Sequence, residues 1–129
     1  APLVLGHPVD KPETIATAIR IGRPARGEQA LEAAQESNGM IIAVPDEEIL
    51  STQKTLASEG LWVEPASAAG LAGLLAKTAA GEFDPRGKKI VVICTGHGLK
   101  DPAIVTDSFA SPQVIPATYK ALSDLIINR

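Results

Sequence analysis

The sequence predicts an α/β fold, in the form of a partial open parallel sheet with flanking helices. Three short apolar runs indicate buried strands, namely Met40–Val44, Leu61–Val63 and Ile90–Cys94. Helix-forming segments separate these runs, and strand–helix–strand connections of this kind join parallel strands in a right-handed sense. Because such a sheet is only about half complete, we expect unpaired strand edges and a chain that is marginally stable or associates readily by itself.

The first third of the chain is expected to hold two helices. Prolines and a Gly-His-Pro sequence favour irregular backbone over residues 1–11, before a short helical pattern runs from Glu13 to Ile21. Good helix formers from Ala25 to Ser37 predict a second helix. It should end near Asn38, because an Asn-Gly pair readily adopts the left-handed conformation that ends helices.

Two further helices are expected between the apolar runs. Three acidic residues follow Pro45, where a helix amino terminus favours negative charge, and this helix should run to about Ser58. Proline lacks a capping side chain, so the cap should be weak. Pro65 opens the next helix, which continues to Ala80 and closes with Gly81. Its apolar residues surround the helix, which predicts burial between the sheet and other helices.

The end of the chain predicts one last helix. Pro112 and Pro116 bracket a loop, and the leucine and isoleucine spacing from Ala117 to Ile127 fits an amphipathic helix. We expect this helix to pack on its own domain, with a subunit contact in a homodimer as the alternative. Residues 111–129 are therefore interpreted as a C-terminal helical tail, distinct from residues 1–110.

Composition narrows the classes of protein to which the chain can belong. With 129 residues and 45% hydrophobic content, the chain can form one packed domain. A net charge of −3 with interspersed signs argues against nucleic acid as a partner. No apolar run approaches a membrane-spanning length, and no signal-peptide pattern is present. A single cysteine, Cys94, and two histidines leave no internal disulfide or zinc cluster, so a reducing cytoplasm is expected.

The most informative stretch follows the last apolar run. There the expected strand stops at Thr95 and enters a loop with two glycines, Gly96 and Gly98. Ligands of parallel α/β sheets bind beyond the carboxyl ends of the strands, and glycine lets the backbone approach them closely. Thr95 is therefore the first candidate for a binding residue. The alternative is a threonine that only caps the loop.

Three segments, in order, resemble the threonine synthase family of pyridoxal-phosphate (PLP) enzymes, which have the tryptophan-synthase-β fold (fold type II). Along the chain, they are Pro-Glu-Thr-Ile-Ala-Thr-Ala-Ile-Arg-Ile-Gly at 12–22, Val-Glu-Pro-Ala-Ser-Ala-Ala at 63–69 and Thr-Gly-His-Gly-Leu-Lys-Asp at 95–101. The resemblance covers the C-terminal third or so of such an enzyme. It implies that residues 1–110 are the C-terminal part of the PLP-binding large domain.

The resemblance implies cofactor-binding roles for five residues. Thr95 would contact the ring nitrogen of PLP, and Gly96 would leave room for the backbone beside the ring. Ala16 and Thr17 lie in the segment that resembles the family's ring-side segment, and Glu64 lies in a segment under the cofactor. Packing would also explain Ala16 and Thr17, and the helix dipole would also explain Glu64.

Other residues of these segments receive no cofactor role. Ser67 is expected to be a helper at most, because a serine in a first helical turn satisfies backbone groups. His97 is left unassigned, and Lys100 is expected to form a surface pair with Asp101. The resemblance places the Schiff-base lysine outside this chain, so no catalytic residue is assigned within it. Surface exposure is expected for two arginines, Arg20 and Arg23.

The activity implied by the resemblance belongs to the intact enzyme. It is the conversion of O-phospho-L-homoserine and water to L-threonine and phosphate, a carbon–oxygen lyase reaction with PLP as electron sink. This chain, without its N-terminal part, is expected to be inactive. Two alternatives stay open: a piece of a threonine or serine dehydratase-like PLP enzyme, or a non-catalytic α/β module that recruits a partner through its sheet edge.

Overall fold

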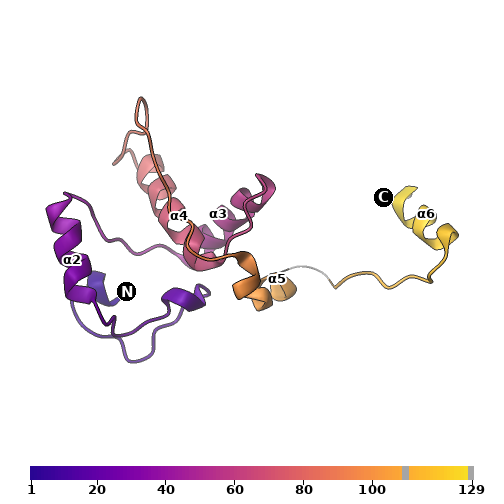
Figure 1. The fold of residues 1–129 in the computed structure, drawn as a ribbon, viewed down its shortest axis with the longest axis horizontal. Helices are drawn as coiled ribbons and strands as arrows, with labels where there is room; N and C mark the ends of the chain where they lie inside the picture. Colours follow the sequence, from indigo (N-terminus) through magenta and orange to yellow (C-terminus); the bar gives the residue numbers. More distant parts are fainter. Residues whose placement is uncertain (109–110, 128–129) are drawn as a thin grey trace.

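A computed structural model describes residues 1–108 and 111–127 as helices joined by irregular segments (Figure 1). The longer elements are α2 (Gly27–Glu36), α3 (Asp46–Ser58) and α4 (Pro65–Ala79). The shorter ones are α1 (Pro2–Leu5), the 3-10 turns η1 (Thr17–Ile19) and η2 (Gly98–Lys100), α5 (Pro102–Ser108) and α6 (Tyr119–Ile127).

Helices α3 and α4 follow the sequence signals closely. The N-cap Pro45 is extended (φ −63°, ψ 147°) and makes no side-chain capping bond, and three acidic residues fill the first turn of α3. Pro65 occupies the first turn of α4, where its missing N–H costs nothing. After α4 ends, Gly81 adopts a φ of 74°. The predicted bounds of both helices are confirmed to within one residue.

The core lies where α3, α4 and η1 meet. Helix α3 packs along α4, and η1 contacts α4 as well. The buried apolar side chains come from these elements and from the segments beside them: Ala16, Ile49, Leu56, Val63, Ala68 and Ala72. Helix α4 is buried on one face only, because Leu75 is half exposed. The expectation that α4 is enclosed on all sides is therefore wrong.

The predicted partial open parallel sheet is also wrong. Among the described residues, β pairing is limited to one isolated antiparallel bridge between Val63 and His97, and no ladder joins the three apolar runs. Val91 is 83% exposed and Ile93 is 73% exposed, so the run expected to be a buried central strand faces solvent. A strand needs a neighbouring backbone to receive its hydrogen bonds, and hydrophobicity alone does not supply one.

The helix predicted for residues 13–21 is reduced to the single turn η1. Side chains intercept the backbone groups that a helix would use. Thr14 Oγ1 accepts the N–H of Ala16 at 3.1 Å, and Asp46 Oδ2 accepts the N–H of Ile15 at 3.0 Å. Threonine and aspartate often compete with helical hydrogen bonds in this way. The backbone here is therefore shaped by a contact with the start of α3.

Helix α2 ends as predicted. Asn38 adopts a φ of 50°, and the N–H of Gly39 donates to the carbonyl of Ala34 at 2.7 Å. This geometry satisfies one of the last carbonyls of the helix. The irregular backbone expected over residues 1–11 is interrupted by the one-turn helix α1, which ends at Gly6 with a φ of 74°.

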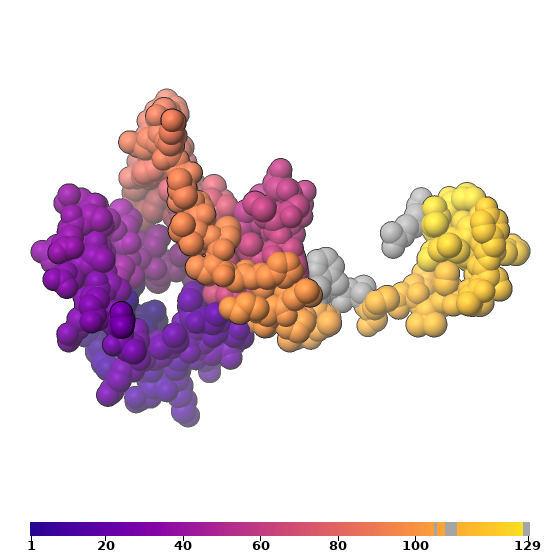
Figure 2. Space-filling view, viewed as in Figure 1, coloured from indigo at the N-terminus to yellow at the C-terminus, as the bar shows by residue number. Residues whose placement is uncertain are grey.

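Helix α6 forms where the spacing predicts it, two residues later than expected. Thr118 Oγ1 accepts the N–H of Ala121 at 3.2 Å, which caps the first turn. None of the α6 residues is buried, and the helix lies apart from α3 and α4 (Figures 1 and 2). Packing of this helix on its own domain is not observed over the described part of the chain. No helix within residues 1–108 or 111–127 is long and apolar enough to cross a membrane.

Candidate functional site

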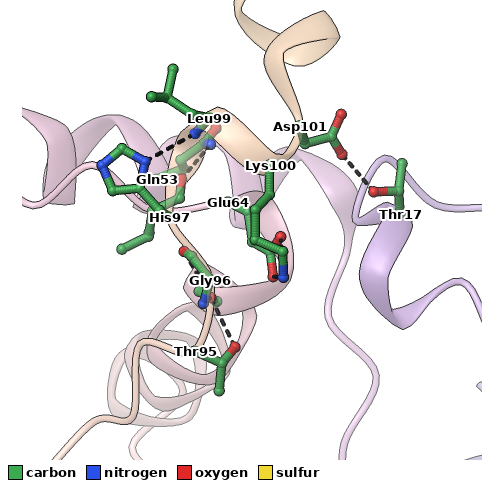
Figure 3. A network of polar contacts seen from close by, with 11 residues as sticks. Thr17, Gln53, Glu64, Thr95, Gly96, His97, Leu99, Lys100 and Asp101 are labelled. Atoms are coloured by element: carbon green, nitrogen blue, oxygen red, sulfur yellow. Dashed lines mark hydrogen bonds and ion pairs between the residues drawn. The ribbon is translucent and has the colours of Figure 1, made fainter.

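The beginning of α4 and the loop after the last apolar run form a polar junction (Figure 3). Residues 62–64 and 96–98 run side by side, joined by the isolated bridge and by backbone hydrogen bonds. These bonds run from Glu64 N–H to Gly96 O at 3.0 Å and from Gly98 N–H to Trp62 O at 3.1 Å. We name residues 95–101 the Thr95–Asp101 loop. The pairing fixes this loop against the amino end of α4.

Ser67 holds the first two residues of the loop. Its Oγ lies 3.0 Å from Thr95 Oγ1, accepts the N–H of Gly96 at 2.7 Å and lies 3.3 Å from the Gly96 carbonyl oxygen. Ser67 is 3% exposed, whereas Thr95 is exposed. Thr95 is therefore an exposed residue of the junction whose hydroxyl is held by a buried hydroxyl. Ser67 satisfies the loop backbone through its side chain, and its own N–H donates to Glu64 O at 3.0 Å.

Glu64 fills the space beside Gly96. Its side chain is 5% exposed, and Lys100 Nζ lies 3.4 Å from Oε2 and 3.5 Å from Oε1. A Cβ on Gly96 would overlap both carboxylate oxygens, so the residue at this position has to be glycine while Glu64 is buried here. A buried carboxylate is costly without an opposite charge, which Lys100 supplies. Lys100 thus pairs with Glu64, and the predicted surface pair with Asp101 is wrong.

Asp101 connects the loop to the segment around η1. Its Oδ2 accepts the hydroxyl of Thr17 at 2.6 Å, and the residue is buried. The neighbouring Ala16 is fully buried in the core. Thr17, one of the predicted site residues, is thereby anchored to the far end of the same loop that carries Thr95 (Figure 3).

The residues before η1 are braced from a second direction. Asp46, the first residue of α3, accepts the hydroxyl of Thr14 at 2.5 Å and the N–H of Ile15 at 3.0 Å. Arg20 donates from Nε to the carbonyl of Thr14 at 2.8 Å and from Nη2 to the same oxygen. The predicted exposure of Arg20 is confirmed, yet its guanidinium also holds this backbone.

His97 and Cys94 do not join this network. His97 Nδ1 accepts the N–H of Leu99 at 3.2 Å, which caps the turn η2, and Cys94 is exposed. The part of the chain that the structure describes contains no group of three or more His, Cys, Asp or Glu residues able to hold a metal ion. The polar groups of the junction are therefore hydroxyls, backbone amides, the buried carboxylates of Glu64 and Asp101, and the Lys100 ammonium group.

Two open cavities lie outside this junction. One, of about 450 Å³, is lined by the amino-terminal segment and the start of α2, including His7, Arg23 and Glu28. The other, of about 600 Å³, lies between residues 38–44 and α4 and is mainly apolar, with Phe83 at its rim. Neither contains the residues that the sequence singled out.

The five predicted site residues fall into two groups joined by one loop. Thr95, Gly96 and Glu64 contact one another or share Ser67. Thr17 bonds to Asp101, and the adjacent Ala16 lies in the core. The loop contacts of Ser67, and the contacts of two aspartates, Asp46 and Asp101, with the segment around η1, were not predicted from the sequence. Only the positions of these aspartates in the sequence gave a signal. Asp46 is the first residue of α3 and was interpreted as a negative charge that favours the helix dipole, and Asp101 is the last residue of the glycine-containing motif.

Comparison with known proteins gives a family match over most of the chain. The model of the family described as pyridoxal-phosphate dependent enzyme matches residues 3–96. The match includes the segment around η1, the start of α4 and the first two residues of the Thr95–Asp101 loop.

Individual relatives agree with this match. The threonine synthase of Mycobacterium leprae is 52% identical over 123 residues, which are 95% of this chain and 34% of that protein. The threonine synthase of Halalkalibacterium halodurans is 47% identical over 128 residues, 98% of this chain and 36% of that protein. The threonine synthase of Methanosarcina acetivorans is 47% identical over 123 residues, which are 95% of this chain and 30% of that protein. The chain spans about a third of the length of these curated relatives.

Proposed function

Because the chain belongs to the family of pyridoxal-phosphate dependent enzymes, we propose that it is the C-terminal part of a threonine synthase. The complete enzyme would convert O-phospho-L-homoserine and water to L-threonine and phosphate, as a carbon–oxygen lyase. Identity of about 50% to threonine synthases over almost the whole chain supports this assignment. The supporting observation in the structure is that Thr95 is an exposed residue whose hydroxyl is held by buried Ser67.

The residues at the junction fit PLP in the chemistry that they offer. The ring nitrogen of PLP needs a hydrogen-bond partner, and Thr95 presents a hydroxyl that is exposed and held in place. The carboxylate of Glu64 is kept in place by Lys100 and by the absence of a Cβ on Gly96. We assign Thr95 to the ring nitrogen, Gly96 and Glu64 to the loop beside it, and Ala16 with Thr17 to the ring-side segment.

Thr95 would set the electronic state of the cofactor through the kind of hydrogen bond that it makes. When bound, PLP supplies an electron sink for the carbon next to the substrate nitrogen. A carboxylate facing the ring nitrogen would hold a proton there, whereas a neutral hydroxyl donates a hydrogen bond and leaves the nitrogen uncharged. Asp101 and Asp46 would keep the ring-side segment in register with Thr95 by holding Thr17 and Thr14.

The lysine that attaches the cofactor is expected outside this chain. Lys100 is the lysine nearest to the candidate site in sequence, yet its ammonium group is paired with the Glu64 carboxylate. An ammonium group held in an ion pair with a buried carboxylate is not free to attach the cofactor. Borohydride treatment of the complete, PLP-loaded enzyme should therefore attach no cofactor to the peptide that contains Lys100.

We further assign residues 1–110 to the large PLP-binding domain and residues 111–129 to a C-terminal helical tail. The absence of buried residues in α6 is consistent with a tail that does not depend on the core. A cytoplasmic location and a homodimer stay predictions of the sequence.

A product assay tests the proposed function. The complete enzyme should release phosphate from O-phospho-L-homoserine and form L-threonine in equal amounts, and Thr95→Val should lower the rate at least about tenfold. Thr78→Ala, which removes another α4 hydroxyl that bonds only to Leu74 O, should leave the rate unchanged. Formation of a keto acid from threonine without threonine synthesis would replace the proposal with a dehydratase. Failure to bind PLP would favour a non-catalytic module.

A further inference from the structure

We infer that Ser67 is a positioning residue that directs the proton of the Thr95 hydroxyl outward, so that Thr95 acts as a donor toward the ring nitrogen of PLP. This inference rests on the proposed function and adds a residue that acts through Thr95. It comes from counting the donors and acceptors at the junction.

Ser67 has one proton to donate and two acceptors within reach. Its Oγ already accepts the Gly96 N–H at 2.7 Å, so its own proton goes either to Thr95 Oγ1 at 3.0 Å or to Gly96 O at 3.3 Å. Gly96 O also accepts the N–H of Glu64 at 3.0 Å. The shorter distance and the less occupied acceptor both favour Thr95.

The direction of this bond decides what Thr95 can offer. A hydroxyl has one proton and two lone pairs. If Ser67 donates to Thr95, the Thr95 proton is free to point away from the protein. If Thr95 donated to Ser67, it would present only lone pairs to its surroundings. An unprotonated ring nitrogen is an acceptor, so only the first arrangement satisfies it.

Burial makes Ser67 suited to this role. The side chain is 3% exposed in the first turn of α4, and the N–H of Ser67 donates to Glu64 O at 3.0 Å. Water therefore has little access to compete for the Ser67 proton. The amide of Gly96 donates to one lone pair of Ser67 Oγ, which makes the Ser67 hydroxyl a better donor to Thr95. Neighbouring bonds of this kind polarise and strengthen one another.

A double-mutant cycle with PLP binding as its readout tests this inference on the complete enzyme. We expect Ser67→Ala and Thr95→Val each to raise the dissociation constant of PLP about fivefold or more. The double variant should resemble Thr95→Val alone, because Ser67 acts through the Thr95 hydroxyl. Ser67→Thr, which retains a hydroxyl, should restore most of the affinity. Thr78→Ala on the same helix is the matched control and should bind PLP like the unmodified enzyme.

A spectroscopic signature separates this role from simple support of the loop. In the holoenzyme reconstituted with PLP labelled with ¹⁵N in the ring, the nitrogen resonance should be that of an unprotonated nitrogen that accepts a hydrogen bond. Ser67→Ala should move it toward the position of a nitrogen without a donor, and Thr78→Ala should not move it. If Ser67→Ala does not fold, Ser67→Cys, with its weaker donor, replaces it in both experiments.

Two results would overturn the inference while leaving the proposed function intact. One is an effect of Ser67→Ala on PLP affinity that is equally large in the Thr95→Val background. The other is an unchanged nitrogen resonance in Ser67→Ala. Failure of the unmodified enzyme to bind PLP would overturn the proposed function itself, so the two failures are distinguishable.

Discussion

The junction between α4 and the Thr95–Asp101 loop differs from helix α6 in what holds each region in place. The junction is built from hydrogen bonds between residues far apart in the sequence, such as Thr17 with Asp101 and Ser67 with Thr95. Helix α6 has its own backbone bonds, one cap from Thr118 and a surface pair between Lys120 and Asp124. Local signals therefore suffice to form helix α6, whereas the junction depends on contacts between residues that are far apart in the sequence.

The largest expected difference between the two regions comes from truncating a leucine in each. Leu56 on α3 lies in the core beside α4, and Leu122 on α6 is half exposed. Leu56→Ala should lower the free energy of unfolding by about 2–4 kcal/mol, because it leaves a cavity. Leu122→Ala should change it by less than about 0.5 kcal/mol. Urea denaturation of the purified protein measures both, and equal losses would show that α6 packs as tightly as the core.

A glycine pair probes the junction itself. Gly96→Ala places a Cβ into the Glu64 carboxylate and should cost about 1–3 kcal/mol of unfolding free energy. Gly70→Ala, on an open face of α4 with nothing within 4 Å of the added Cβ, should instead add about 0.5–1 kcal/mol. The midpoint of chemical denaturation gives both values. If Gly96→Ala is tolerated as well as Gly70→Ala, the carboxylate of Glu64 does not lie against Gly96.

The hydrogen bond between Asp101 of the loop and Thr17 of η1 is expected to contribute less to stability than Leu56 or Gly96. A cycle of Asp101→Asn and Thr17→Val should show a coupling of about 1 kcal/mol, the contribution of a hydrogen bond from the exposed Thr17 to the buried Asp101 carboxylate. Asp107→Asn, on exposed α5, serves as the control and should lie within about 0.5 kcal/mol of the unmodified protein. Additive effects in the cycle would mean that these two side chains do not interact.

The smallest effect is expected in the exposed turn at Asp84, away from both regions. Side-chain and backbone hydrogen bonds from Arg86 lower the pKa of Asp84 below its ordinary value of 3.8. A lowered pKa in the folded state stabilises the protein above the unfolded pKa, and this contribution is lost as pH falls through the folded value. The difference in melting temperature between the unmodified protein and Asp84→Asn should therefore be small near neutral pH and disappear on acidification. A difference that grows in acid would contradict the sign.

Helix positions could be predicted because their signals are local. Pro45 with the acidic residues after it, Asn38 at the end of α2 and Pro65 at the start of α4 all act within one turn of the chain. The same holds for α6, whose spacing alone predicted it. Its packing could not be predicted, because an apolar stripe does not specify what covers it.

The absence of a sheet from the described part of the chain and the contacts of Asp46 and Asp101 could not be predicted, because both depend on residues far away in the sequence. The run before Thr95 has the hydrophobicity of a buried strand, but no neighbouring strand pairs with it within the described residues. The chain spans about a third of its relatives' length. Asp46 and Asp101 contact residues 31 to 84 positions away, a distance at which no local pattern gives a signal.

A crystal structure of the complete enzyme with PLP bound would test most directly our proposal that the hydroxyl of Thr95, held by Ser67, faces the ring nitrogen of the cofactor. We expect a distance of about 2.7–3.2 Å between Thr95 Oγ1 and that nitrogen, with the Ser67–Thr95 contact retained. A ring nitrogen that faces another side chain, or a Thr95 hydroxyl turned away from it, would contradict the proposal.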